Sequence, residues 1–447
     1  MRLLSPRAAQ QRNQARPGNG ELNKLYPEDR RVHDWYRFVL SYPPHLVRDY
    51  LERFGLDARH RVLDPFCGTG TTLVECKRLG IASVGIEANP IAHLASSVKV
   101  NWSIDPEAFV ENSERIAGAA IAELQAQGIE DDLLCGVPLG GDRPHTNLRT
   151  LDPETMGLLL AGSISPLPLH KTLVLLDHLN EHQGKTYHRH QQLALARELM
   201  SSIGNLAFGP EVGVTAPKPD APVVPVWLSR VRAMAGDLQE LQGKEGVPAE
   251  VHWGDSREIF HLLEPASVDA VITSPPYPNE KDYTRTTRLE SVLLGLVHTK
   301  AELRGIKHHL IRSNTRNVYK SDDDDRWVAD NPDVQRIAEE IEARRTAMGK
   351  TSGFERMYAR VAKLYFGGMA RHLSDLRAIL RPGAHLAYVV GDQASYLRVM
   401  IRTGQILADI AASLGYEVVG IDLFRTRRAS ATNEDLREEV LLLRWLG

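Results

Sequence analysis

Short apolar runs alternate with longer amphipathic segments in two separate parts of the chain. The runs are six to eight residues long and end near glycine, proline or polar residues, which predicts buried strands. The predicted strands are RVLDPF (61–66), ASVGIEA (82–88), AEVHWGD (249–255), VDAVITS (268–274), AHLAYVV (384–390), EVVGIDLF (417–424) and EEVLLLRW (438–445). Strands that alternate with helices indicate an α/β fold with a mostly parallel sheet covered on both faces.

The segments between these strands have the spacing of apolar residues that is typical of helices. Helices are expected at 33–55 with an interruption near Pro43-Pro44, and at 71–80, 90–100, 256–263, 354–380 and 396–414. Ligands of such sheets bind beyond the carboxyl ends of the strands, so the residues just after each strand are candidates for a functional site.

The alternation stops between the second and third strands. Helix-like runs occur there at 106–127, 153–161, 170–182, 191–203 and 226–242, separated by segments rich in proline and glycine. We therefore expect a helical insertion at 103–247 within a catalytic domain formed by 31–102 and 248–447. Residues 1–30 are expected to form a flexible arm, and a second, irregular insertion is expected at about 291–353.

Composition narrows the class of protein. The chain has 447 residues, 43% hydrophobic and 25% charged, which is ordinary for a globular protein and excludes a disordered one. The formal net charge of −3 gives no global positive field, so a nucleic acid would have to meet local basic patches. Three cysteines, Cys67, Cys76 and Cys135, form neither a disulfide framework nor a zinc motif, and no metal site is expected. No apolar run is long enough to span a membrane, so a cytoplasmic location without a membrane partner is expected.

The first candidate site follows the first predicted strand. Asp64-Pro65-Phe66-Cys67-Gly68-Thr69-Gly70-Thr71 leads from a strand through glycines into a helix, where free backbone N–H groups meet a ligand closely. The alternative is a generic tight turn. A dinucleotide fingerprint requires a further glycine, but position 73 is Leu, and no Gly-Lys-Ser/Thr of a P-loop follows.

Two acidic residues follow the next strands. Glu87 ends the second strand, where a carboxylate accepts both hydroxyls of a ribose. Asp255 follows the third strand and is placed to accept a hydrogen bond from an adenine amino group. For both residues the alternative is an ordinary helix cap or surface acid.

The sharpest motif is Thr273-Ser274-Pro275-Pro276-Tyr277, directly after the fourth strand. Two prolines fix φ and carry no N–H, so the loop is stiff. Ser274 adds a hydroxyl, and Tyr277 adds a flat ring on which a base stacks. The alternative is a simple proline turn, but the motif ends a strand at the same sheet edge as the other candidates.

Together these motifs resemble the S-adenosylmethionine-dependent DNA amino-methyltransferases, which modify cytosine N4 or adenine N6. DPFCGTGT (64–71) is similar to the family's cofactor motif, TSPPY (273–277) to its catalytic motif, and SYPPHLVRDYL (41–51) to a segment that covers the methionine end of the cofactor. The resemblance covers about 33–102, 249–290 and 354–447. It implies a seven-stranded Rossmann-like methyltransferase sheet with S-adenosyl-L-methionine as cofactor.

The resemblance also implies a role for each matching residue. Asp64, Phe66, Cys67, Gly68, Gly70, Thr71, Glu87 and Asp255 would bind the cofactor, with Glu87 on the ribose and Asp255 on the adenine. Ser274 and the Pro275 carbonyl would accept hydrogen bonds from the target amino group, within the catalytic loop Ser274-Pro275-Pro276-Tyr277. Tyr277 would stack on a base flipped out of duplex DNA.

The choice of reaction depends on the catalytic loop. Cytosine C5 chemistry needs a cysteine nucleophile, and none of the cysteines lies near 274–277. In the family, Ser before Pro-Pro-Tyr favours cytosine N4, whereas Asp or Asn favours adenine N6. The same motifs would also occur in an RNA amino-methyltransferase or in a non-catalytic binder that retains the fold.

DNA contacts are expected from arginines near the catalytic loop. Arg285 and Arg288 follow it, and Arg312 and Arg316 lie in the segment 300–320, which has six basic residues against one acidic residue. The insertion at 103–247 is the candidate target-recognition region, and the region at 291–353 is the alternative. A restriction or defence nuclease is the partner that such an enzyme implies.

Overall fold

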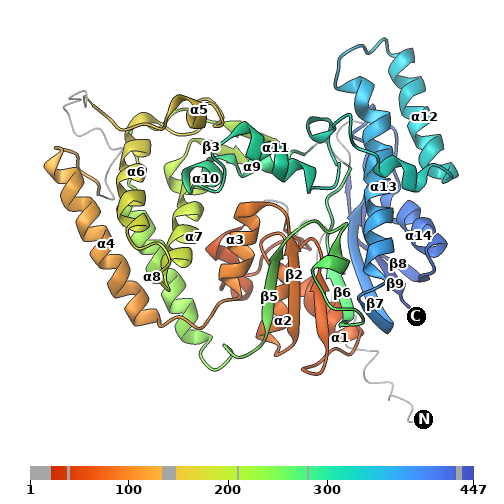
Figure 1. The fold of residues 1–447 in the computed structure, drawn as a ribbon, viewed down its shortest axis with the longest axis horizontal. Helices are drawn as coiled ribbons and strands as arrows, with labels where there is room; N and C mark the ends of the chain where they lie inside the picture. Colours follow the sequence, from red (N-terminus) through yellow and green to blue (C-terminus); the bar gives the residue numbers. More distant parts are fainter. Residues whose placement is uncertain (1–21, 38–40, 133–146, 209–210, 279–280, 429–434) are drawn as a thin grey trace.

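A computed structural model describes residues 22–37, 41–132, 147–208, 211–278, 281–428 and 435–447. Its centre is a seven-stranded sheet with the strand order β5-β2-β1-β6-β7-β9-β8 (Figure 1). The strands are β1 Arg61–Asp64, β2 Ala82–Glu87, β5 Ala249–Trp253, β6 Val268–Thr273, β7 Leu380–Gly391, β8 Glu417–Arg428 and β9 Asp435–Arg444. Neighbours from β5 to β7 pair in parallel, and β9 is antiparallel to both β7 and β8. The predicted Rossmann-like methyltransferase sheet is confirmed.

Helices cover both faces of this sheet and form a separate lobe at one side. The helices are α1 Pro44–Arg53, α2 Thr71–Arg78, α3 Pro90–Lys99, α4 Pro106–Ala126, α5 Pro153–Met156, α6 Pro166–Asn180, α7 His188–Glu198, α8 Val224–Glu240, α9 Tyr283–Thr286, α10 Arg288–Leu293, α11 Lys300–His308, α12 Pro332–Ala347, α13 Tyr358–Leu376 and α14 Thr403–Ser413. In the view of Figure 1, α4–α8 lie to the left of the sheet, α12–α14 lie to its right, and α9–α11 cross above it.

The helical insertion shares a hydrophobic core with the sheet domain. Trp227 of α8 and Phe109 of α4 lie in the same buried cluster as Leu94 of α3 and Trp35 of the N-terminal segment. A second cluster joins α13 and α14 to the sheet. Because apolar side chains from both regions fill one core, the insertion is held to the catalytic domain by burial rather than by a linker.

Several predicted elements are shorter or differently formed in the structure. The helix expected at 33–55 begins only at Pro44, after a 3₁₀ turn at His33–Trp35, and the helix expected at 256–263 is a 3₁₀ turn at Ile259–His261. The helix expected at 396–414 begins at Thr403. The strand expected at 384–390 begins at Leu380.

Several elements of the insertions were not predicted, among them α11 in the region expected to be irregular. A small hairpin pairs β3 Leu206–Phe208 with β4 Val212–Val214. The region 291–353, expected to be irregular, contains the 16-residue helix α12. That helix begins at Pro332 with Asn331 as a side-chain cap, and its four buried residues all lie on one face.

The N-terminal arm is only partly described. Residues 1–21 lie outside the described residues, as does Cys135. Residues 22–30 are not a free arm, because a 3₁₀ turn forms at Pro27–Asp29. The Asp29 carboxylate is buried and accepts two hydrogen bonds from Arg48 of α1, at 2.8 and 3.0 Å. No helix in the described part of the chain is long and apolar enough to cross a membrane.

Candidate active site

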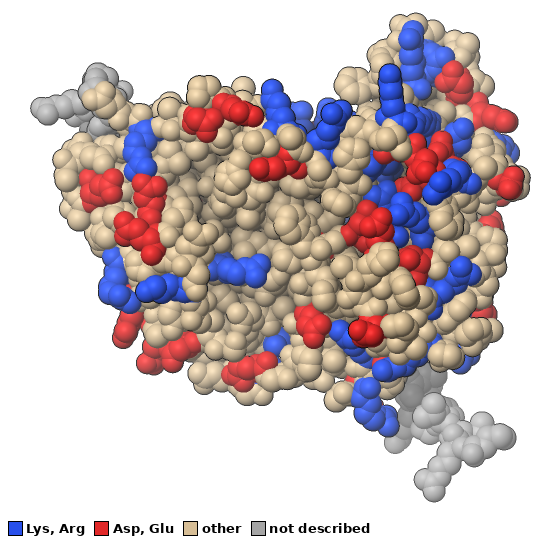
Figure 2. Space-filling view, viewed as in Figure 1, with Lys and Arg blue, Asp and Glu red and all other residues tan. Residues whose placement is uncertain are grey.

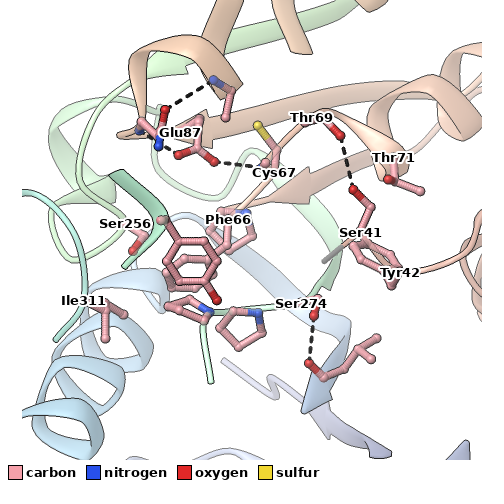
Figure 3. Close-up of a pocket in the computed structure, with 18 of the residues that line it drawn as sticks. Ser41, Tyr42, Phe66, Cys67, Thr69, Thr71, Glu87, Ser256, Ser274 and Ile311 are labelled. Atoms are coloured by element: carbon pink, nitrogen blue, oxygen red, sulfur yellow. Dashed lines mark hydrogen bonds between the residues drawn. The ribbon is translucent and has the colours of Figure 1, made fainter. Parts of the chain in front are cut away.

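The glycine turn and the proline loop open into one cavity of about 230 Å³ (Figure 3). The glycine turn follows β1 and the proline loop follows β6, and these two strands are direct neighbours in the sheet. The strand order reverses between them, since β2 and β5 continue on one side and β7 on the other. This switch point is where ligands bind in open α/β sheets.

The glycine turn is shaped by two left-handed residues. Gly68 has φ +50° and Gly70 has φ +84°, a region that side chains avoid. The Cys67 N–H donates to the Ile86 carbonyl at 3.1 Å, which ties the turn to β2. A Cβ on Gly68 would meet no protein atom within 4 Å, so the backbone there faces open space. Phe66, Cys67, Gly68 and Thr71 all line the cavity.

Glu87 holds the rim of this turn. Its two carboxylate oxygens accept the backbone N–H groups of Gly68 at 2.8 Å and Asn89 at 2.7 Å. Burial raises the pKa of Glu87 to about 7. A carboxylate has about four acceptor positions, so two remain for hydroxyl groups of a ligand. The side chain lines the cavity, as its predicted ribose role requires.

Asp64 and Gly70 do not line the cavity, and their predicted cofactor role stays a prediction. Asp64 is 0% exposed and accepts hydrogen bonds from Thr273 at 2.6 Å and Tyr42 at 2.9 Å. It therefore ties the glycine turn to the catalytic strand. Gly70 packs against α3, where an added Cβ would lie 3.1 Å from that of Ser96.

Asp255, predicted to bind the adenine, also does not line the cavity. Its carboxylate is 7% exposed and bound by the guanidinium of Arg257, whose Nε lies 2.9 Å from Oδ1. Arg257 also reaches Asp324. The Asp255 carboxylate is thus bound in an internal network of ion pairs. Its neighbours Gly254 and Ser256 line the cavity.

The proline loop supplies the opposite wall of the cavity. Ser274, Pro275, Pro276 and Tyr277 all line it. The Ser274 hydroxyl donates to the Val389 carbonyl of β7 at 3.2 Å (Figure 3). Since the hydroxyl has one hydrogen, its oxygen can also accept a hydrogen bond, and the Tyr277 phenol lies within hydrogen-bond reach of it. Burial raises the pKa of the Tyr277 phenol, which keeps the ring neutral.

The absence of a side chain at Gly391 lets the Tyr277 ring pack against the backbone there. A Cβ at residue 391 would lie 3.0 Å from Cε2 of the Tyr277 ring, which is tighter than most contacts of real Cβ atoms. The ring therefore packs directly on the backbone at the end of β7. A larger residue at 391 would push the ring into the cavity.

The four arginines expected to contact DNA differ in how far their guanidinium groups are exposed and already hydrogen-bonded within the protein. Arg312 is 3% exposed and its guanidinium is bound by Asp322 at 2.8 Å. Arg288 donates to the Thr284 carbonyl at 3.0 Å and the Leu158 carbonyl at 3.3 Å. In this structure the guanidinium groups of these two residues are engaged by internal partners, and their phosphate contacts stay predictions. Arg316 is exposed and pairs with Glu211 at 3.5 Å, and Arg285 has a buried Nε with no partner among the described residues.

Some cavity residues had no predicted role, among them Tyr283, Ile311, Val389 and Glu438. Thr69 lies in the glycine motif, Ser256 follows Asp255, Phe424 and Arg425 lie in the basic segment 424–430, and Ser41 and Tyr42 lie in the segment that the resemblance had matched. Ser41 approaches Thr69 at 3.4 Å, beside the glycine turn (Figure 3). The described residues contain no cluster of three metal-ligating side chains.

Comparison with known proteins agrees with this site. A family model described as DNA methylase matches residues 7–96. The type II methyltransferase M.BsoBI of Geobacillus stearothermophilus is 24% identical, over 91% of this chain and 83% of its own length. The type II methyltransferase M.AvaI of Anabaena variabilis is 22% identical, over 93% of this chain and 84% of its own length.

A solved structure of TrmN from Thermus thermophilus aligns with 95% of this chain and 55% of its own, at 10% identity. Its TM-score of 0.33 is too low for that alignment to bear on function. The site and the matched sequences define a methyltransferase. The match over residues 7–96 and the similarity of almost the whole chain to type II methyltransferases support the DNA amino-methyltransferase family, whose methyl donor is S-adenosylmethionine.

The cavity fits that donor. Gly68 leaves backbone space where a ligand would approach, and Glu87 offers two acceptor positions for ribose hydroxyls. Phe66 and Ile311 add apolar surface for a purine ring. When bound, the donor supplies an electrophilic methyl group on a sulfonium.

Proposed function

We propose that this protein is a site-specific DNA methyltransferase that modifies the N4 amino group of a cytosine flipped out of the duplex. The observation that carries the proposal is the placement of Ser274-Pro275-Pro276-Tyr277 in the same cavity as the glycine turn and Glu87. One wall therefore suits the cofactor and the facing wall suits an amino group and a ring.

The catalytic loop orients the nucleophile. The Ser274 O–H is committed to the Val389 carbonyl, so its oxygen meets the target amino group as an acceptor. The Pro275 carbonyl accepts the second N–H. Two acceptors on the amino hydrogens favour a pyramidal nitrogen whose lone pair points at the methyl carbon. Tyr277 stacks on the flipped base and excludes water.

Cytosine N4 is favoured over adenine N6 by the serine before Pro-Pro-Tyr, since the family resemblance associates that residue with cytosine. Adenine N6 is the second candidate. The described residues show no RNA-binding module that would favour an RNA substrate.

The DNA is proposed to lie across the hollow between the helical lobe and α12–α14. Lys and Arg side chains gather above this hollow, where α11 crosses (Figure 2). Arg285 and Arg316 are the retained candidates for phosphate contacts, and the helical insertion 103–247 is proposed to read the target sequence. The proposed reaction implies a cytoplasmic location and a cognate restriction or defence nuclease as partner.

Nucleoside analysis tests the proposal. The protein is incubated with labelled S-adenosylmethionine and plasmid DNA, and the DNA is digested and analysed by mass. N4-methyldeoxycytidine is expected. N6-methyldeoxyadenosine would overturn the base assignment, and label in RNA alone would overturn the DNA assignment.

Ser274→Ala tests the catalytic loop. Without an acceptor on the amino group, kcat is expected to fall about 100-fold or more, since a single positioned polar group contributes on this order. The Kd for S-adenosylmethionine, measured by calorimetry, is expected to stay within about twofold. Ser395→Ala, at an exposed position, is the matched control. A Ser274→Ala enzyme with wild-type kcat would remove this residue from the mechanism.

A further inference from the structure

Two charged residues of the last hairpin line the active-site cavity. Arg425 of β8 and Glu438 of β9 are direct cross-strand partners, and the Arg425 Nε donates to the Glu438 carboxylate. Their side chains are only 19% and 12% exposed. Burying an ion pair costs desolvation energy, so such a pair in a cavity wall is a candidate for contact with a ligand.

The pair stands beside the catalytic loop. A Cβ built on Gly391 would lie 3.0 Å from Cε2 of Tyr277 and 3.5 Å from Cγ of Glu438, so both side chains converge on that glycine. Two residues earlier on β7, the Val389 carbonyl holds the Ser274 hydroxyl. The ion pair therefore lies on the wall next to the place where the target amino group would be held.

The guanidinium of Arg425 has unused donors. Glu438 is its only hydrogen-bond partner in the described parts of the chain, and the contact uses Nε alone. A guanidinium carries five N–H donors, so the Nη atoms remain for a ligand. Glu438 fixes the plane of the fork. Among the other acidic and histidine side chains that line the cavity, Glu87 ends β2 and His309 follows α11, at the cofactor end.

The acceptors of the two possible target bases differ beside the amino group. Cytosine presents N3 and then O2 along the edge that starts at N4. Adenine presents N1 and then a C–H group. A guanidinium fork next to the amino site therefore matches two acceptors on cytosine and only one on adenine.

We propose that Arg425, held by Glu438, binds N3 and O2 of the flipped base and selects cytosine over adenine. The inference rests on the proposed function, which it deepens. It assigns base selection to a hairpin far along the chain from the glycine turn.

The test uses the full-length protein and its own target site, located by sequencing plasmid DNA that the enzyme has methylated. Two duplexes carry either cytosine or adenine at the target position. For Arg425→Gln, kcat/KM on the cytosine duplex is expected to fall about 10- to 100-fold, the range of a lost bidentate base contact. The ratio of the cytosine rate to the adenine rate is expected to fall with it.

Arg437→Gln is the matched control. It removes the same charge from β9 at the neighbouring residue, whose side chain is paired with Glu439 rather than with a cavity residue. The ratio of its cytosine rate to its adenine rate is expected to equal that of the wild type. The double variant Arg425→Gln/Glu438→Gln leaves no unpaired buried charge, so it is expected to melt close to the wild type yet keep the loss of selectivity.

The outcomes distinguish failure of the proposed cytosine N4 activity from failure of the role proposed for Arg425. If the wild type produces N6-methyladenine, the proposed function fails and Arg425 has no cytosine to read. If the wild type produces N4-methylcytosine and the double variant binds S-adenosylmethionine normally with an unchanged cytosine-to-adenine ratio, only the role of Arg425 is overturned.

Discussion

At the scale of single residues, the site depends on which polar groups the fold leaves free. Glu87 and Ser274 lie at the ends of strands along one sheet edge, so their positions could be predicted from the strand pattern alone. Asp255 follows a strand in the same way, but Arg257 two residues later captures its carboxylate. Arg425 and Glu438 could not be predicted, because their meeting depends on the register of two strands.

Glu87 provides a test at this scale. Its pKa in the folded protein is about 7, whereas its ordinary value is 4.5. Two ribose hydroxyls need the ionised form as acceptor. The affinity for S-adenosylmethionine is therefore expected to rise about tenfold per pH unit up to about pH 7 and then to level off. Calorimetry between about pH 5.5 and 8.5 measures this.

The pH dependence of folding stability that Glu87 contributes has the opposite direction to that of cofactor affinity. Because the folded state holds the proton more tightly than the unfolded state, the contribution of Glu87 to the stability of the unliganded protein is lost as the pH rises through about 7. Glu87→Gln is expected to bind the cofactor weakly at every pH and to melt above the wild type at about pH 8. An unchanged pH profile of binding in Glu87→Gln would contradict the ribose role.

At the scale of elements, the seven strands were predictable because each contains a short apolar run, although the edge strands β5 and β8 are only partly buried. Helix α12 was missed although Val334, Ile337 and Ile341 have helical spacing and Asn331 is a good cap, so the signal was present in the sequence. The 3₁₀ turn at 259–261 could not be predicted, since a helix and a single turn share one pattern over so few residues.

Helix α13 makes the closest approach between elements. A Cβ on Gly367 would lie 1.9 Å from the backbone oxygen of Asp324, in the turn Asp324–Val328. Gly367→Ala is therefore expected to lower the free energy of unfolding by about 1–3 kcal/mol, as overpacking does. Gly118→Ala, in α4 with no neighbour within 4 Å, is expected to raise it by about 0.5–1 kcal/mol. Urea unfolding of both variants measures the contrast, and equal midpoints would contradict the close contact.

At the scale of the whole molecule, the net charge of −3 conceals local fields. Within 300–320, Lys307 pairs with Asp282, Arg312 with Asp322 and Arg316 with Glu211. Lys300, Arg304 and Lys320 have no such acidic partner among the described residues. The positive surface of this segment is therefore smaller than its composition indicated, and it is concentrated around α11.

Arg304 tests that surface. It is exposed on α11, with its guanidinium 5.1 Å from the centre of the Tyr319 ring. Arg304→Gln is expected to weaken DNA binding equally for cognate and unrelated duplexes and to reduce the slope of log K against log salt by about one. Fluorescence anisotropy over a salt series measures both. Arg59→Gln, in the exposed turn before β1 at the opposite edge of the sheet, is the control, and an unchanged slope for Arg304→Gln would place the DNA elsewhere.

The position of β9 has a consequence for how the enzyme is made. This strand, Asp435–Arg444, inserts between β7 and β8, although both precede it in the chain, and it brings Glu438 to the cavity. A nascent chain that has emerged from the ribosome only as far as β8 has the glycine turn and the proline loop but lacks the strand that completes the wall. The cavity wall is therefore complete only once β9 has been released and paired, and a premature stop before Asp435 is expected to leave an inactive protein.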